Sequence, residues 1–443
     1  MPLVVQTNRF SKMKNVDSLA VPITKPQVET LAFDAQLSTL KSDFIALWQN
    51  ISEEFAQFGR VYTQEEQRAT EAKVEETMIV EKDVDPNSDE AALQLQRMKA
   101  TVRSMVVRSM APEHSDETDA ILGEFSEAGD EFVRQARVFD PDLGVEDIFQ
   151  ALRNLWIINS MQVGFGLPVR VTPSGLAYSL LYPYTDNYLD NPSITGAKKR
   201  EYSRRFRGRL AGFANPVTSP LESRTWDLVE MIESEFSRSL YPEAYESLLA
   251  IHAGQEKSLR QHAIPDRWVQ SDLLDISVEK GGTSVLADAY LVKGTLSTEE
   301  AEFSFGYGVF LQFIDDLQDV EEDCRNGHQT LFTLAAAKGD LDMMANRLHR
   351  FIDDVLTSSN SCVLSRPGTL TELVRRSCHI LILESIAQSP GLYSDSYCRK
   401  VERYSPMGFV QIRRLQEKMK ARQKKLRKVL SNKRVLTFAA AYV

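Results

Sequence analysis

Apolar residues recur at spacings of three and four along most of this 443-residue chain, and no convincing series alternates apolar and polar residues. The first spacing is typical of helices that bury one face, whereas strict alternation would indicate half-buried strands. Two segments, "TQEE" at 63–66 and "STEE" at 297–300, have the form of capping boxes at helix starts. The pattern predicts an all-α protein.

One segment interrupts this pattern early in the chain. "KDVDPNSDE" at 82–90 breaks a charged helical stretch, and no comparable break follows until "SRPGT" at 365–369. About 80 residues of mostly polar helix precede it, while the 43% hydrophobic content of the chain supports a sizeable core. We therefore predict a helical N-terminal extension over 1–95 and one large helical domain over 96–443.

Composition excludes several classes of protein. The formal net charge is −10, which argues against a general nucleic-acid binder, because basic residues supply most non-specific affinity for phosphate backbones. The four cysteines form no CxxC pair, so reduced thiols are the simplest interpretation. No signal peptide or membrane span is predicted, since no stretch approaches 18 uninterrupted apolar residues. We expect a cytoplasmic protein.

The segment "FGYGVFLQFIDDLQDVEED" at 305–323 combines an apolar run with concentrated negative charge. Helical spacing places a set of its residues on one face, namely Gly308, Gln312, Asp315, Asp316, Asp319 and Asp323. Neighbouring carboxylates repel one another, and burial would raise their pKa values. A divalent cation such as Mg²⁺ would compensate, since it binds one or two carboxylates together with phosphates. The alternative is a solvated acidic helix end.

A second acidic pair lies in "YPYTDNYLDNPSIT" at 182–195. Asp186 and Asp190 are one helical turn apart, and Asn191 follows. Alone, such a pair is weak evidence for a site. Two acidic sets that face each other across a helical cavity would hold a metal cluster capable of binding a diphosphate.

Four segments resemble the class I isoprenoid synthases. "GVFLQFIDDLQD" at 308–319 fits the GxxxQxxDDxxD pattern of that superfamily, and "DNYLD" at 186–190 resembles its first Asp-rich motif. "EKGGTSVLADAYLVKG" at 279–294 is similar to the segment of polyprenyl synthases that carries a diphosphate-binding lysine, here Lys280. "GHQTLFT" at 327–333 resembles their glycine-lysine segment, with His328 in place of the lysine. The resemblance covers roughly residues 150–340.

The resemblance implies a class I terpenoid synthase-like helical bundle with a central active-site cavity. It implies a prenyl diphosphate substrate and Mg²⁺, three ions per site, with Mn²⁺ as an alternative metal, and it allows a homodimer. The catalytic residues it implies are Asp186, Asp190, Asp315 and Asp319, with Asp316 and Asp323 as further metal ligands. The substrate-binding residues would be Asn191, Lys280, Gln312, Arg325, Arg403 and Tyr404.

Two departures distinguish the chain from enzymes that elongate prenyl chains. Asn187 stands where those enzymes usually have a second Asp, and "GAKKREYSRRF" replaces their Arg-Arg-Gly segment. These differences favour a cyclase that releases a terpene hydrocarbon or alcohol plus diphosphate. The alternatives are a condensing enzyme, either elongating or head-to-head like squalene and phytoene synthases, and a non-catalytic helical module that binds membranes or a partner.

The C-terminal segment 413–434 contains eleven basic residues and one acid. A solvated helix face is the default interpretation of such a charge run. The functional alternative is peripheral contact with anionic lipid, which would suit an enzyme that takes a long prenyl substrate from a membrane.

Overall fold

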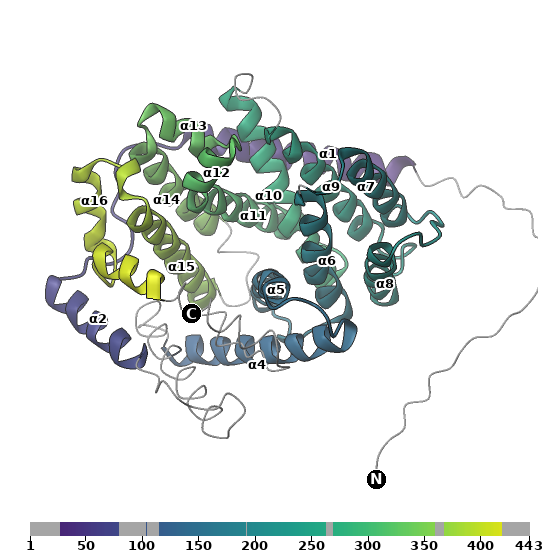
Figure 1. Cartoon of the computed structure of the whole chain (residues 1–443), viewed down its shortest axis with the longest axis horizontal. Helices are drawn as coiled ribbons and strands as arrows, with labels where there is room; N and C mark the ends of the chain where they lie inside the picture. Colours follow the sequence, from purple (N-terminus) through teal and green to yellow (C-terminus); the bar gives the residue numbers. More distant parts are fainter. Residues whose placement is uncertain are drawn as a thin grey trace, which may run out of the picture.

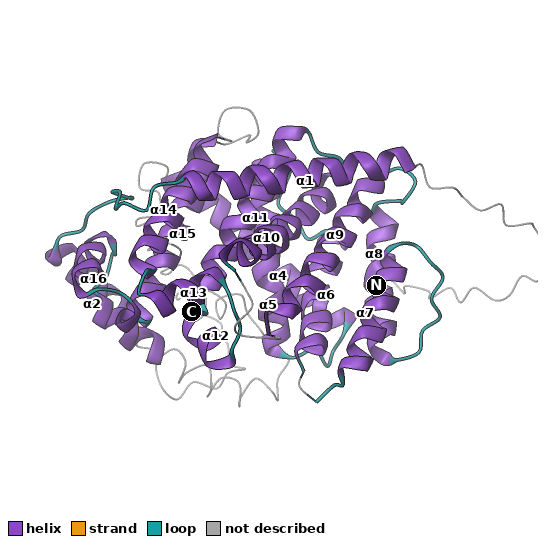
Figure 2. Cartoon of the chain, turned by 90° about the horizontal axis from the view of Figure 1, so that it is seen from above, coloured by secondary structure: helices purple, strands orange, loops and turns teal. Residues whose placement is uncertain are grey.

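The computed structural model describes residues 27–78, 103, 115–191, 193–262, 269–358 and 367–418. These residues form helices, turns and loops without a strand, which confirms the prediction of an all-α fold (Figure 2). The helices are α1 (Gln27–Asn50), α2 (Gln64–Met78), α4 (Ser115–Phe139), α5 (Val145–Gly164), α6 (Pro173–Asp190), α7 (Gly196–Leu210), α8 (Pro220–Glu235), α9 (Pro242–Ser258), η2 (Leu259–His262), α10 (Gln270–Lys293), α11 (Thr298–Gln318), α12 (Val320–Asn326), α13 (Leu331–Lys338), α14 (Leu341–Ser358), α15 (Pro367–Gln388), η3 (Pro390–Leu392), α16 (Asp395–Val401) and η4 (Glu402–Tyr404). Residues 409–418 form one more helical segment, and the candidate linker 82–90 lies outside the described residues.

Helices α10 and α11 form the centre of the bundle (Figure 1). Most of their side chains are buried, as expected for helices that are apolar on nearly every side and must be covered all round. The surrounding helices include α1, α5, α6, α9, α14 and α15.

Glycines allow α10 and α11 to approach closely. A Cβ atom at Gly308 would lie 2.0 Å from the carbonyl oxygen of Gly281, and one at Gly282 would lie 2.3 Å from the ring of Phe305. Gly308 therefore serves helix packing, although it shares the face predicted to carry the acidic residues.

Helix α1 belongs to the same hydrophobic core as α10 and α11. The ring of Trp48 lies 4.4 Å from that of Phe313, and Phe44 lies 5.7 Å from Phe305, measured between centroids. The sequence predicts residues 1–95 as an extension of the main domain. In the structure, α1 packs against α10 and α11, because half of its residues are apolar and Phe44 and Trp48 lie on the side that faces α11. No helix in the described part of the chain is long and apolar enough to cross a membrane.

Candidate functional site

The positions of the two acidic segments can be compared along helix α10, which packs against both α6 and α11. It runs antiparallel to α6, because Ser174 Oγ at the start of α6 donates to Leu291 O near the end of α10 (2.9 Å). Further along, the hydroxyls of Tyr182 on α6 and Ser284 on α10 lie 2.7 Å apart. Asp186 is one turn beyond Tyr182, so it lies level with the α10 turn that precedes Ser284.

Helix α10 also packs against α11, again in antiparallel orientation. Lys293 near the end of α10 pairs with Glu300 near the start of α11 (2.6 Å), and Ser277 Oγ donates to Asp316 Oδ2 (2.8 Å). Asp315 and Asp316 therefore lie level with the α10 stretch that contains Ser277 and Lys280. Asp186 and Asp315, far apart in sequence, thus lie beside the same part of α10.

Asp316 and Gln312 point into the contact between α10 and α11. Besides the bond from Ser277, Asp316 accepts a hydrogen bond from Gln312 Nε2 (2.7 Å). Burial raises the pKa of Asp316 to about 6, and the positive charge of Lys280 acts in the opposite direction. Asp316 was predicted as a metal ligand and Gln312 as a substrate contact. In this structure, both side chains are engaged in joining the helices.

The remaining acidic residues form an outward-facing row. Helix α11 ends before Asp319, but Asp319 N still donates to Asp315 O (3.0 Å) and Asp323 N to Asp319 O (2.8 Å). The three residues therefore keep the shared face predicted for one continuous helix. Burial, followed by the negative charges of Asp315, Asp323 and Glu322, raises the pKa of Asp319 to about 6, whereas Arg153 of α5 lowers it. Such a row favours binding of a cation.

Asp323 has a partner on the segment that follows α12. His328 Nδ1 lies 2.9 Å from Asp323 Oδ1, and His328 N donates to Asp323 O (2.9 Å). His328 is thus bonded to the last residue of the acidic row. Arg325 is exposed, and its Nε donates to Glu321 O (3.2 Å).

Asp186 is half-buried and accepts from Gln255 Nε2 of α9 (3.2 Å) and from Thr185 Oγ1 (3.3 Å). Gln255 and Thr185 also line a small cavity of about 30 Å³ between α6, α7 and α9. No sequence pattern marked Gln255 as a neighbour of the acidic pair. Asp190 ends α6, and its side chain lies outside the described residues. Asn191 follows α6, and its Oδ1 accepts from Ser193 N (2.9 Å) and Ser193 Oγ (2.7 Å).

The structure does not bring Arg403 and Tyr404 to the acidic residues. The ring of Tyr404 stacks on that of Phe58 at 4.6 Å, and Tyr62 N donates to Arg403 O (2.7 Å). The α16–η4 segment that carries them lies at the opposite end of the molecule from α6 in both views (Figures 1 and 2). Their expected role in substrate binding therefore has no geometric support, since a two-residue match says nothing about which helices pack together.

The sequence analysis missed a buried carboxyl group in the interior of the bundle. Asp288 of α10 has no exposed surface, and Asn154 Nδ2 of α5 donates to its Oδ1 (3.0 Å). Asp288 Oδ2 has no hydrogen-bond partner among the described residues. Burial raises the pKa of Asp288 well above its ordinary value. The only available signal was an acid within the apolar run "SVLADAYLV" at 284–292.

The donor types suit a hard divalent cation, because every candidate ligand is a carboxylate. Among the described residues, no three His, Cys, Asp or Glu side chains are grouped closely enough to hold a metal ion by themselves. Oxygens from a bound diphosphate would have to complete the coordination, as is usual for Mg²⁺, which takes few protein carboxylates. Comparison of the chain with protein-family models and with curated proteins finds no match.

Proposed function

We propose that this protein is a Mg²⁺-dependent class I terpenoid synthase, which ionises a prenyl diphosphate and releases a terpene hydrocarbon or alcohol plus diphosphate. The observation that carries the proposal is that Asp186 and Asp315 lie beside the same part of α10, and that Asp315 begins a row that continues through Asp319 to Asp323. Two sets of carboxylates on separate helices can share cations with one diphosphate. The sequence motifs in these helices point to the same chemistry.

Each group has a distinct part in this proposal. Asp186, Asp315 and Asp319 would hold Mg²⁺, which stabilises the negative charge of the departing diphosphate. Lys280 is half-buried and has no ion-pair partner within 4.0 Å in the described part of the chain, so its ammonium is available to donate to a diphosphate oxygen. Asp316 fixes α11 against α10 and thereby keeps Asp315 on the outward face.

Two of the seven basic residues of α7 are not available for the second cationic site of an elongating enzyme. An elongating enzyme needs a second cationic site for its co-substrate, and α7 occupies the corresponding place in the sequence. Arg205 binds Glu222, and Arg209 binds Glu233 (2.6 Å). These two arginines are already neutralised by α8, which leaves them unsuited to a second diphosphate.

Removal of the metal and of single carboxylates tests the proposal. We expect Asp186→Ala and Asp315→Ala each to lower diphosphate release at least about 100-fold while the protein stays folded, since metal coordination supplies several kcal/mol of charge stabilisation. Asp227→Ala removes an exposed carboxyl on α8 and is the matched control, with near-normal activity. Full activity in EDTA, or in both variants, would contradict the proposal.

Substrate requirement separates cyclisation from condensation. The purified protein is incubated with Mg²⁺ and a series of allylic prenyl diphosphates, with and without isopentenyl diphosphate, and organic extracts are analysed by mass spectrometry. We expect a hydrocarbon or alcohol from one allylic diphosphate alone. A longer diphosphate that forms only when isopentenyl diphosphate is present would show elongation, and a head-to-head hydrocarbon of twice the chain length would show the other condensing activity.

A further inference from the structure

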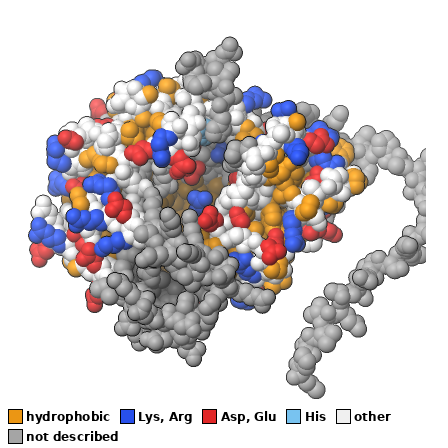
Figure 3. Space-filling view, viewed as in Figure 1, with side chains coloured by type: hydrophobic (Ala, Val, Ile, Leu, Met, Phe, Trp, Pro, Cys, Tyr) orange, Lys and Arg blue, Asp and Glu red, His pale blue; other side chains and the backbone are white. Residues whose placement is uncertain are grey.

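Large apolar side chains are exposed where α7 and α8 meet their flanking loops. Phe213 and Val217 in the α7–α8 loop are 68% and 52% exposed, and Leu240 in the α8–α9 loop is 72% exposed. Single exposed apolar residues are common on soluble proteins, but a group of them beside polar residues marks a contact surface. Figure 3 shows hydrophobic and basic side chains together at the surface on this side of the molecule.

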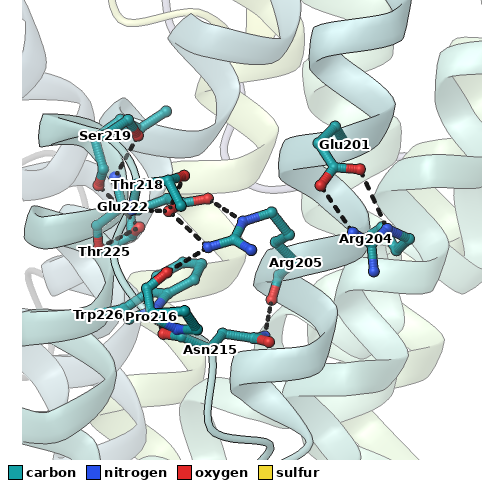
Figure 4. A network of polar contacts seen from close by, with 11 residues as sticks. Glu201, Arg204, Arg205, Asn215, Pro216, Thr218, Ser219, Glu222, Thr225 and Trp226 are labelled. Carbon is teal, nitrogen blue, oxygen red and sulfur yellow. Dashed lines mark hydrogen bonds and ion pairs between the residues drawn. The ribbon is translucent and has the colours of Figure 1, made fainter.

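The α7–α8 loop is held firmly while it exposes these residues (Figure 4). Arg205 Nε donates to Glu222 Oε1 (2.5 Å), and this bond is the main reason that the pKa of Glu222 is lowered to about 2. Asn215, inside the loop, donates through Nδ2 to Arg205 O (2.8 Å) and accepts from Trp226 Nε1 (2.8 Å). The exposure of the neighbouring apolar side chains is therefore a fixed feature of the fold.

A second set of bonds joins the two loops. Arg238, in the α8–α9 loop, donates to the carbonyl oxygens of Arg209 (3.1 Å) and Leu210, which end α7. Its side chain also lies 3.4 Å from the position that a Cβ at Gly212 would occupy. Phe213 and Leu240 therefore extend from two loops that are bonded to each other at the end of α7.

Helix α7 supplies positive charge beside this junction. It contains seven basic residues and one acid, in a chain whose net charge is −10. Its exposed cations are Lys198, Arg200, Arg204 and Arg207, of which Arg204 also forms an exposed ion pair with Glu201 (2.8 Å). The last three are spaced by four and three residues and share one face. Helix α8 adds exposed Asp227 and Glu230, so any attraction to an anionic partner must come from α7 and should weaken with salt.

We infer that this surface, the α7 corner, formed by Lys198, Arg200, Arg204, Arg207, Phe213 and Leu240, docks on an anionic lipid bilayer. The cations match lipid phosphates, while Phe213 and Leu240 would enter the interface between headgroups and acyl chains. A nucleic acid would match the cations alone and leave the apolar side chains in water. Helix α7 begins shortly after the acidic end of α6, but the inference does not depend on the proposed chemistry.

Hydrogen–deuterium exchange and vesicle co-sedimentation test the α7 corner in the full chain. With vesicles of phosphatidylcholine and phosphatidylglycerol at low salt, we expect slower exchange in peptides from 196–219 and 236–241, and no such change with pure phosphatidylcholine or at high salt. Arg200→Gln with Arg204→Gln and Arg207→Gln should lower vesicle partitioning about 100-fold, because each of the three cations contributes roughly fivefold near such a surface. Phe213→Ser with Leu240→Ser should separately lower it about tenfold, because the apolar side chains no longer enter the interface.

Matched variants at the other end of the molecule are the controls. Val61→Ser with Met343→Ser removes exposed apolar residues, and Arg68→Gln, Lys338→Gln and Arg399→Gln remove exposed cations, far from the α7 corner. We expect both to bind vesicles like the wild type. The inference is overturned if the control and test variants partition equally, if the α7 corner gains no protection, or if single-stranded RNA protects it while vesicles do not.

Discussion

Replacement of Asp288 by Asn gives a quantitative test of the buried interior. Asp288 has no exposed surface and no cation among its described partners, so burial favours its neutral form in the folded protein. In the unfolded chain, an Asp ionises above a pKa of about 3.9. Between that value and the raised pKa of the folded state, the native protein therefore binds one more proton than the unfolded chain.

The sign and size of the effect follow from proton linkage. Because the native state holds the extra proton, the stability that Asp288 contributes is complete at acidic pH and falls by about 1.4 kcal/mol for each unit of rising pH. The loss continues with rising pH until the raised pKa of Asp288 in the folded protein is reached. Asn has the same shape, cannot ionise and keeps an oxygen that can accept from Asn154, so Asp288→Asn removes this pH dependence.

The assay is urea unfolding of the wild type and Asp288→Asn at pH 5, 6 and 7, followed by circular dichroism at 222 nm. We expect the difference in unfolding free energy to shift in favour of the variant by about 1.4 kcal/mol per pH unit. Other titrating groups cancel in the difference, and Asp227→Asn reports the effect of removing a surface charge. A difference that stays constant from pH 5 to pH 7 would refute the reasoning, since Asp288 would then have the same protonation in both states.

Two other outcomes are expected from the structure. Gly308→Ala should destabilise the fold by about 1–3 kcal/mol in thermal or urea unfolding, because its Cβ would lie 2.0 Å from Gly281 O. The control Gly391→Ala should change stability little, because no atom lies within 4 Å of its Cβ position. Equal effects of the two substitutions would contradict the close packing of α10 and α11. Removal of residues 419–443, which include most of the basic segment, should reduce co-sedimentation with anionic vesicles at low salt, while activity on a short soluble substrate persists. Equal sedimentation of the full and shortened chains would show that these residues are only a solvated or packed helix face.

The position of that truncation comes from the structure. Ile412, which directly precedes the basic segment, is buried, and Arg413 Nη1 donates to Ala387 O of α15 (2.8 Å). Phe409 is also buried. Residues up to Lys418 therefore belong to the folded protein, and the remainder of the basic segment lies outside the described residues, where its contact with membranes stays a prediction.

Local sequence was sufficient for the helical class and for the row formed by Asp315, Asp319 and Asp323, but it wrongly placed Asp316 on the same face. Spacings of three and four determine which side chains share one side of a helix, and this is why Asp315, Asp319 and Asp323 could be predicted to form a row. The capping box at Ser297, which starts α11, is also present as predicted. These features depend only on residues within one or two turns of each other.

Only the tertiary structure decided which neighbouring residues each helix face contacts. Asp315 and Asp316 are adjacent in sequence, yet Ser277 and Gln312 bind Asp316 while Asp315 faces outward. Likewise, α1 joins the core although it was predicted to belong to an N-terminal extension, and the α16–η4 segment that carries Arg403 lies away from α6. Helical periodicity sets the direction of a side chain relative to its own helix, but the partner it reaches depends on how separate helices pack, and that is determined by contacts between residues distant in the chain.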